Sequence, residues 1–147
     1  MTGAAPETIE ELIAHGWELA ADTLAHAQSE RELVTHWFIT PEDSAVNSDE
    51  HFGSNERTVT FVRLVLPTLA DQLDASHMLT AVPWDVDDQP ALLVLIAALH
   101  GEDAVIEARP ITRVERNENA APPWWSMAPE TADPPVELIE EVALLSI

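Results

Sequence analysis

The sequence predicts an α+β fold in which one long N-terminal amphipathic helix packs on a mainly antiparallel sheet of four to five strands. Three observations lead to this prediction: a helical repeat of apolar residues near the N-terminus, several short runs rich in β-branched residues, and turn residues between those runs. The 147 residues are a length typical of one domain, and 46% of them are hydrophobic, which is enough to form a core. We therefore expect a single domain over residues 1–147, with one or two short helices besides the long one.

The first helix is expected over residues 8–27, after a disordered lead over residues 1–6. Thr8 and Glu11 have the spacing of a capping box, and Gly16 weakens the middle of the helix. Apolar residues fall on one face at helical spacing: Ile9, Leu12, Ile13, Ala20, Leu24 and Ala27. Charged and polar residues fall on the opposite face: Glu7, Glu11, His15, Glu18, Asp22 and His26.

Two strands are expected in the next third of the chain, separated by a long loop. Residues 34–40 are rich in β-branched and aromatic residues and predict a strand, with a helix as the alternative. Residues 41–56 predict a polar loop. The clearest strand is predicted over residues 58–66, where β-branched residues follow one another until Pro67.

A short helix is then expected over residues 68–75, with Thr68 at its cap, followed by a strand over residues 78–82 that stops at Pro83. The apolar run over residues 91–99 admits two interpretations. It is either a helix capped by Asp88 or one strand of a hairpin, and the Gly-containing connection favours the hairpin.

The returning strand of that hairpin is expected over residues 104–109, with an edge or a bulge from residue 111 to 115 because Pro110 interrupts it. Residues 117–135 contain five prolines and predict an extended segment without regular structure, packed by its tryptophans. Residues 136–147 predict a short helix that frays into a terminal strand.

Charge is the most pronounced feature of the composition. The chain has 27 acidic residues, six arginines and no lysine, which gives a formal net charge of −21. The net charge is −11 over residues 1–56, −5 over residues 57–110 and −5 over residues 111–147, so the acidity is spread along the chain and is densest in the first third. We expect it to cover the folded surface.

Such a surface excludes some classes of partner. It repels phosphate backbones and anionic lipid headgroups, so we expect no direct binding of nucleic acid and no membrane association. The longest apolar run has nine residues, whereas a membrane-spanning helix needs about 20. The absence of cysteine excludes disulfides and thiolate metal sites, and together with the lack of a signal-peptide pattern it predicts a soluble cytoplasmic protein.

Two carboxylate-containing groups are candidates for a metal site. His15, Glu18, Asp22 and His26 form a helical stripe, but they are spread over roughly 16 Å of helix and cannot all reach one ion. The segment Trp84–Asp88 holds three aspartates, yet it lacks the glycine and glutamate of a calcium loop, which favours a turn followed by a helix cap. His36, Asp49, His51 and His77 are scattered along the chain. We therefore expect no metal and no cofactor, and no motif nominates a catalytic residue.

The tryptophans supply candidate anchors for a partner. Trp84, Trp124 and Trp125 lie beside prolines in segments interpreted as loops, and exposed loop tryptophans bury large areas when a complex forms. The alternative is that Trp124 and Trp125 only fix the proline-rich segment onto the sheet.

These observations predict a non-enzymatic acidic binding protein that docks a negative face on a basic protein partner, such as a toxin or a nucleic-acid-binding protein. An immunity protein and an inhibitor that imitates the charge of DNA both have these properties. The expected contact residues are Glu7, Glu11, Glu18, Asp22, Asp43, Asp49, Glu50, Trp84, Trp124 and Trp125. The alternatives are a structural subunit of a larger complex, a small metal-dependent hydrolase, and a housekeeping protein of a salt-rich cell that is acidic for solubility alone.

Overall fold

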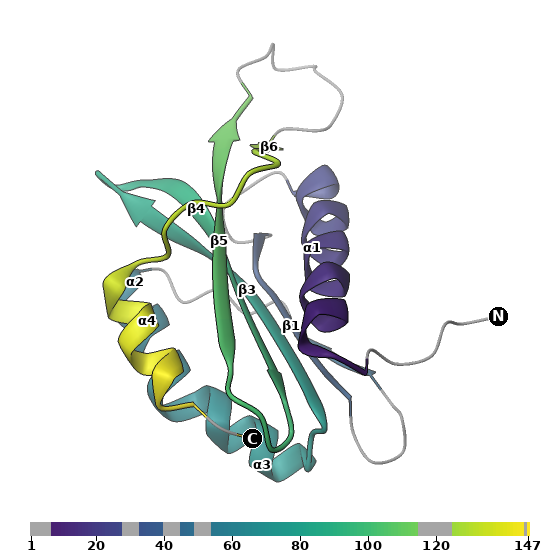
Figure 1. Ribbon diagram of the computed structural model, residues 1–147. Coiled ribbons are helices and arrows are strands. Elements are labelled where there is room, and N and C mark those ends of the chain that lie inside the picture. Colours follow the sequence, from purple (N-terminus) through teal and green to yellow (C-terminus); the bar gives the residue numbers. More distant parts are fainter. Residues whose placement is uncertain (1–6, 28–32, 40–44, 49–53, 115–124, 146) are drawn as a thin grey trace, which may run out of the picture.

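The protein is an α+β domain in which an antiparallel sheet lies between helices on both faces, as the computed structural model shows (Figure 1). The structure describes residues 7–27, 33–39, 45–48, 54–114, 125–145 and 147. The predicted disordered lead at 1–6, most of the predicted polar loop and the first part of the proline-rich segment lie outside these ranges. The elements, in chain order, are α1 (Ile9–His26), β1 (Thr35–Ile39), β2 (Ala45–Ser48), α2 (Asn55–Thr60), η2 (Phe61–Val65), α3 (Leu66–Leu73), β3 (His77–Val86), β4 (Gln89–Leu99), β5 (Val105–Arg113), β6 (Trp125–Met127) and α4 (Val136–Ala143).

The sheet has the strand order β2-β1-β3-β4-β5-β6, and every pairing is antiparallel. The long β3–β4 hairpin forms its centre. Its turn is made by Asp87 and Asp88, both with positive φ, as a two-residue hairpin turn requires. Strand β4 also pairs antiparallel with β5, from Leu92 opposite Pro110 to Ala97 opposite Val105, which confirms the hairpin interpretation of residues 91–99. Asp88 is a turn residue and not a helix cap.

Helix α1 covers one face of the sheet, and its predicted start is confirmed. Thr8 is the N-cap and accepts a hydrogen bond from the Glu11 backbone N–H at 3.1 Å, while the Glu11 carboxylate accepts one from the Glu7 N–H. The helix buries Leu12, Gly16 and Ala20 against the α1-face core, which also contains alternate residues of β3 and β4.

The other face is covered by the consecutive helical segments α2, η2 and α3 and by α4 (Figure 1). The strand predicted over 58–66 is therefore wrong. Ser54 caps α2 by accepting from the Arg57 N–H, and the hydroxyls of Thr58 and Thr60 donate to carbonyls four residues earlier, so both find their partners within the helical run.

Pro67 does not end this helical run either. The segment η2 is a π-helical turn in which the Leu66 N–H donates to the Phe61 carbonyl, and it directly precedes the proline that cannot donate. The predicted helix over 68–75 is consequently the end of a longer one, which closes at Asp74 in the left-handed conformation.

Five further expectations are corrected. Strand β2 lies inside the predicted loop, and β6 lies inside the segment predicted to lack regular structure. Pro83 does not stop β3, because the last β1 pair is with Ala81 and beyond it no β1 residue opposes β3. Pro110 does not interrupt β5, because it pairs with Leu92 of β4 and the next three residues pair with β6. The short C-terminal helix is confirmed as α4, but the described residues after it form no strand.

Candidate functional site

The outer face of α1 carries four of the predicted contact residues. Glu7, Glu11, Glu18 and Asp22 are all exposed on α1 or directly before it, on the side opposite the buried Leu12, Gly16 and Ala20. No arginine lies within residues 7–27. This group of four carboxylates, here called the α1 acidic face, is therefore not interrupted by arginine side chains of its own helix.

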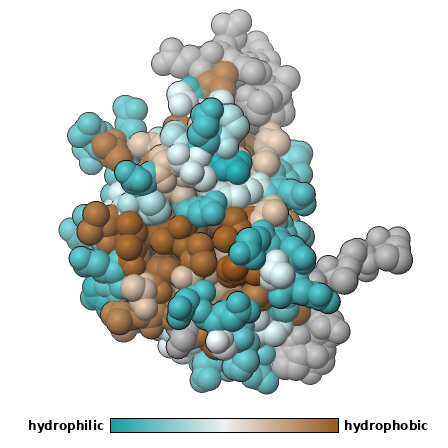
Figure 2. All heavy atoms as spheres, in the orientation of Figure 1, coloured by the Kyte–Doolittle hydropathy of each residue, from teal (hydrophilic) through white to brown (hydrophobic). Residues whose placement is uncertain are grey.

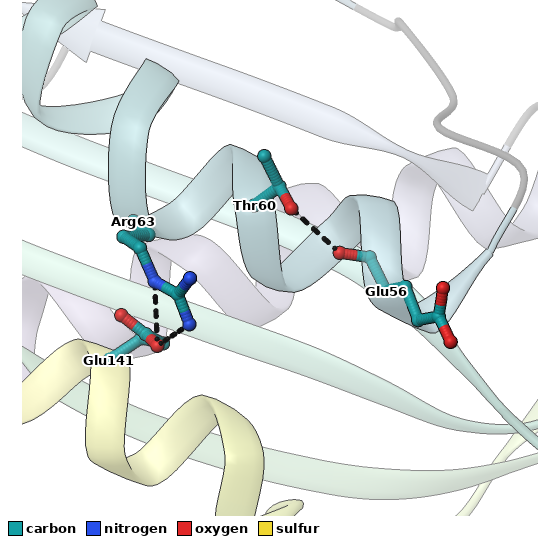
Figure 3. Close-up of polar contacts among 4 residues, drawn as sticks. All are labelled: Glu56, Thr60, Arg63 and Glu141. Atoms are coloured by element: carbon teal, nitrogen blue, oxygen red, sulfur yellow. Dashed lines mark hydrogen bonds and ion pairs between the residues drawn. The ribbon is translucent and has the colours of Figure 1, made fainter.

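Three of the arginines are occupied on other elements. The Arg63 Nε and Nη2 both donate to one oxygen of Glu141, which joins η2 to α4 (Figure 3). The guanidinium of Arg109 lies 4.4 Å from the centre of the Trp17 ring, and that of Arg113 lies 5.3 Å from the centre of the Trp125 ring. Arg63 and Arg113 contact residues outside α1, whereas Arg109 lies over Trp17, on a flank of α1 away from the α1 acidic face.

The Arg63–Glu141 pair also shifts the titration of both groups. The hydrogen bond from Arg63, together with its charge, lowers the pKa of Glu141 below its ordinary value. The same hydrogen bond and charge raise the pKa of Arg63 further above neutrality. Figure 3 shows that the contact spans the two neighbouring helical elements, with Thr60 bonded back to Glu56 one turn earlier in α2.

The tryptophans are not exposed anchors where the structure describes them. Trp84 lies in β3, not in a loop, and is 8% exposed in the core beneath α2, η2 and α4. Trp125 lies in β6 and is 5% exposed in the α1-face core. The interpretation of Trp125 as a staple of its segment fits this burial. Trp124, Asp43, Asp49 and Glu50 lie outside the described residues.

The histidines that the structure describes do not form a metal site with the carboxylates. His15 packs against Trp37 with ring centroids 5.1 Å apart, and His26 contacts the Asp22 backbone carbonyl. His36 is buried beside Phe61 and the Thr80 hydroxyl, and His77 contacts Ser76. Over the part of the chain that the structure describes, no three His, Cys, Asp or Glu side chains gather as ligands for one ion.

Sequence reasoning missed a second surface, which lies along β5 and α4. Val136 and Ile139 on α4 are 64% and 40% exposed, and the space-filling view shows a hydrophobic band at the position of α4 and β5 (Figure 2). The exposed position of β5 follows from the strand order, which the sequence does not reveal. The sequence contains one signal of this surface. Leu138 and Val142 are enough to form the buried face of α4, so Val136 and Ile139 are additional apolar residues that remain exposed.

None of the described helices is long and apolar enough to cross a membrane. Comparison of the chain with protein-family models, with curated proteins and with solved structures finds no match in any of the three.

Proposed function

We propose that this chain is a non-enzymatic acidic binding protein whose α1 acidic face docks on a basic protein. The observation that carries the proposal is the arrangement of charge: four exposed carboxylates share one helix surface, the helix has no arginine, and Arg63, Arg109 and Arg113 are engaged away from that surface. A toxin neutralised by an immunity protein and a nucleic-acid-binding protein blocked by a charge mimic are the partner classes with suitable charge.

The physical basis is long-range attraction followed by short-range fit. A net charge of −21 raises the encounter rate with a cationic surface, and the effect weakens when salt screens it. Opposite charges at the rim of an interface contribute more to encounter and orientation than to final affinity. A rigid helix supports this role because it fixes the spacing of its carboxylates.

The alternative of an assembly subunit loses one of its supports. That interpretation placed Trp124 and Trp125 across a neighbouring chain, but Trp125 is buried within its own domain. Among the described residues no cluster of ligands supports a metal-dependent hydrolase. We therefore take the acidic docking protein as the leading proposal.

The test compares two variants that change net charge equally. One neutralises the α1 acidic face with Glu7→Gln, Glu11→Gln, Glu18→Gln and Asp22→Asn. The control neutralises four exposed acids on other elements with Glu56→Gln, Asp71→Asn, Asp74→Asn and Glu130→Gln. Gln at position 11 keeps the capping acceptor, so α1 remains capped.

Partners are captured from extracts of the source cells on the immobilised wild-type chain, purified, and measured again as isolated components. We expect a basic protein whose affinity falls roughly tenfold or more with the α1 variant and much less with the control. Raising salt from about 0.05 M to about 0.5 M should weaken binding of the wild type most. Equal affinity of both variants, or affinity independent of salt, would reject the α1 acidic face as the docking surface.

A further inference from the structure

The outer edge of β5 is covered over only part of its length. Strand β6 pairs with Ile111–Arg113, the Ala128 N–H donates to the Pro110 carbonyl, and the Ala132 N–H donates to the Ala108 carbonyl at 2.8 Å. The chain then leaves the edge and begins α4 at Val136. Residues 104–107, here called the open edge, have no strand beside them within the described parts of the chain.

The backbone of the open edge is oriented to pair with another strand. Residues two apart on an antiparallel strand direct their backbone groups to the same side. The carbonyl of Ala108 points outward to Ala132, so the N–H and C=O of Ile106 also point outward. At about 3.3 Å per residue the open edge is roughly 13 Å long, enough for a short added strand.

One side of the open edge is apolar. On α4 the 100° spacing of a helix puts Val136, Ile139 and Ala143 on one flank and Glu141 on the opposite flank, where Arg63 of η2 binds it. The apolar flank therefore faces away from η2 and toward β5, which α4 also contacts. Figure 2 shows the resulting hydrophobic band, and the side chain of Ile106 packs on this same sheet face.

The other side of the open edge is acidic. The Trp17 indole N–H donates to the Glu107 carboxylate at 2.9 Å, which fixes the flank of α1 that lies next to β5. Glu10 lies two turns before Trp17 on that flank and is exposed. Glu102 and Asp103 are exposed in the turn that leads into β5. The one arginine close to this side, among the described residues, is Arg109, and its guanidinium stacks on the Trp17 ring.

The two sides together identify the occupant. A strand added here would point alternate side chains toward α4 and toward α1. A second copy of this chain would bring a further charge of −21 and place its own carboxylates near Glu107, which like-charge repulsion opposes. A segment that alternates apolar and basic residues matches both sides.

We propose that the open edge binds an extended segment of a basic protein as an added strand. The segment's apolar side chains contact Ile106 and Ile139, and its lysine or arginine side chains face Glu10 and Glu107. This inference rests on the proposed function in that its occupant belongs to a basic partner, but it concerns a different surface from the α1 acidic face.

The test uses two capped eight-residue peptides of identical composition. One alternates valine and lysine, and the other has four valines followed by four lysines. Both carry the same charge, so the difference between them reports strand alternation alone. By fluorescence anisotropy at low salt we expect the alternating peptide to bind at least about tenfold more tightly, and hydrogen exchange of the Ile106 amide should slow on binding.

A variant and a matched control localise the binding. Val136→Lys with Ile139→Lys puts positive charge on the apolar flank of α4 and should weaken the alternating peptide about tenfold or more. Leu64→Lys with Val65→Lys, at residues 59% and 42% exposed on η2, adds the same charge and should leave binding nearly unchanged. The Ile106 exchange measurement uses the wild-type chain, so it tests binding at the open edge even if the double variant does not fold.

The outcomes separate the two proposals. Equal binding of both peptides, or no binding of either, overturns the proposal that the open edge binds a basic segment. The proposal for the α1 acidic face is then still tested by its own variants. Protection of Ile106 without peptide, together with a dimeric mass in solution, identifies a second copy as the occupant and overturns the basic segment. Slowed Ile106 exchange with the alternating peptide supports the open edge even if no partner is captured through α1.

Discussion

Gly16 lies where helix α1 packs closely on the sheet. A Cβ atom there would lie 2.9 Å from Leu79 Cδ2 and 2.9 Å from Leu95 Cδ1, and both leucines are buried. Gly16→Ala adds about 0.5–1 kcal/mol of helix propensity, but overpacking costs about 1–3 kcal/mol. We expect a net loss in the free energy of unfolding, measured by urea denaturation.

Relief of the crowding provides the control for this substitution. Leu95→Val removes one methylene group at the point of contact, so the double variant with Gly16→Ala should lose less stability than the sum of the two single variants. A Gly16→Ala protein that is more stable than the wild type would show that α1 does not lie as close to β3 and β4 as described. The sequence identified Gly16 only as a weak point of the helix, because close packing depends on which strands pass beneath it.

The Arg63–Glu141 pair gives stability a defined dependence on pH. The pKa of Glu141 is lowered in the folded state, so its stabilising contribution is complete above the ordinary carboxyl pKa and is lost as the pH falls through the lower folded value. Thermal unfolding should therefore show wild type more stable than Glu141→Gln near neutral pH, with the difference vanishing in acid. An unchanged difference at low pH would contradict this sign. Because the Arg63 side chain is 56% exposed, added salt should also reduce the difference.

At the scale of elements, α2 holds the far end of β3 through one side chain. The Asn55 amide donates to the Asp85 carbonyl at 2.8 Å, and its oxygen accepts from the Asp85 N–H at 2.9 Å, at the register shift between Trp84 and Asp85. Asn55→Ala removes both hydrogen bonds and should cost about 1–3 kcal/mol. Amide exchange at the end of the hairpin should accelerate at the same time.

Ser54→Ala is the matched control. It removes the cap of α2, at a cost of about 1 kcal/mol, but it leaves the Asn55 contacts in place. Hairpin exchange that accelerates equally in both variants would show that α2 as a whole, and not Asn55, holds the strand end.

Local signals predicted the elements whose partners are close in the sequence. The capping box at Thr8 and the apolar hairpin over β4 and β5 needed no knowledge of the sheet. The helical run from Asn55 was misread because its β-branched residues resemble a strand, although Phe61, Val62, Leu66 and Ala70 are buried at helical spacing. Packing beneath the sheet outweighed propensity there.

The candidate surfaces were predictable to different degrees for a related reason. The α1 acidic face follows from one helix, so its carboxylates could be read from spacing alone. The open edge depends on the strand order, on where β6 stops and on where α4 begins, and none of these is local. The sequence predicted a loop at Trp84 because of its neighbour Pro83. In the structure β1 begins only opposite Ala81, so no β1 residue opposes Pro83 and the proline can remain in the strand.

At the scale of the whole molecule, the acidity should weaken the fold that carries it. A net charge of −21 repels itself, and salt screens that repulsion, so the midpoint of thermal unfolding should rise from low to moderate salt. Both four-residue neutralised variants should be more stable than wild type at low salt, with a smaller rise on adding salt. A midpoint independent of salt in all three proteins would indicate that the charges are too dispersed to repel strongly.

The contact between Gly101 and Ile147 bears on how the binding assays are built. The Gly101 N–H donates to the Ile147 carbonyl at 3.2 Å, so any residues attached after Ile147 start beside the turn that enters β5. A flexible affinity tag fused there could compete with a titrated peptide as an intramolecular ligand, at a high effective concentration. In the peptide assay, immobilisation and labelling are therefore better placed ahead of α1.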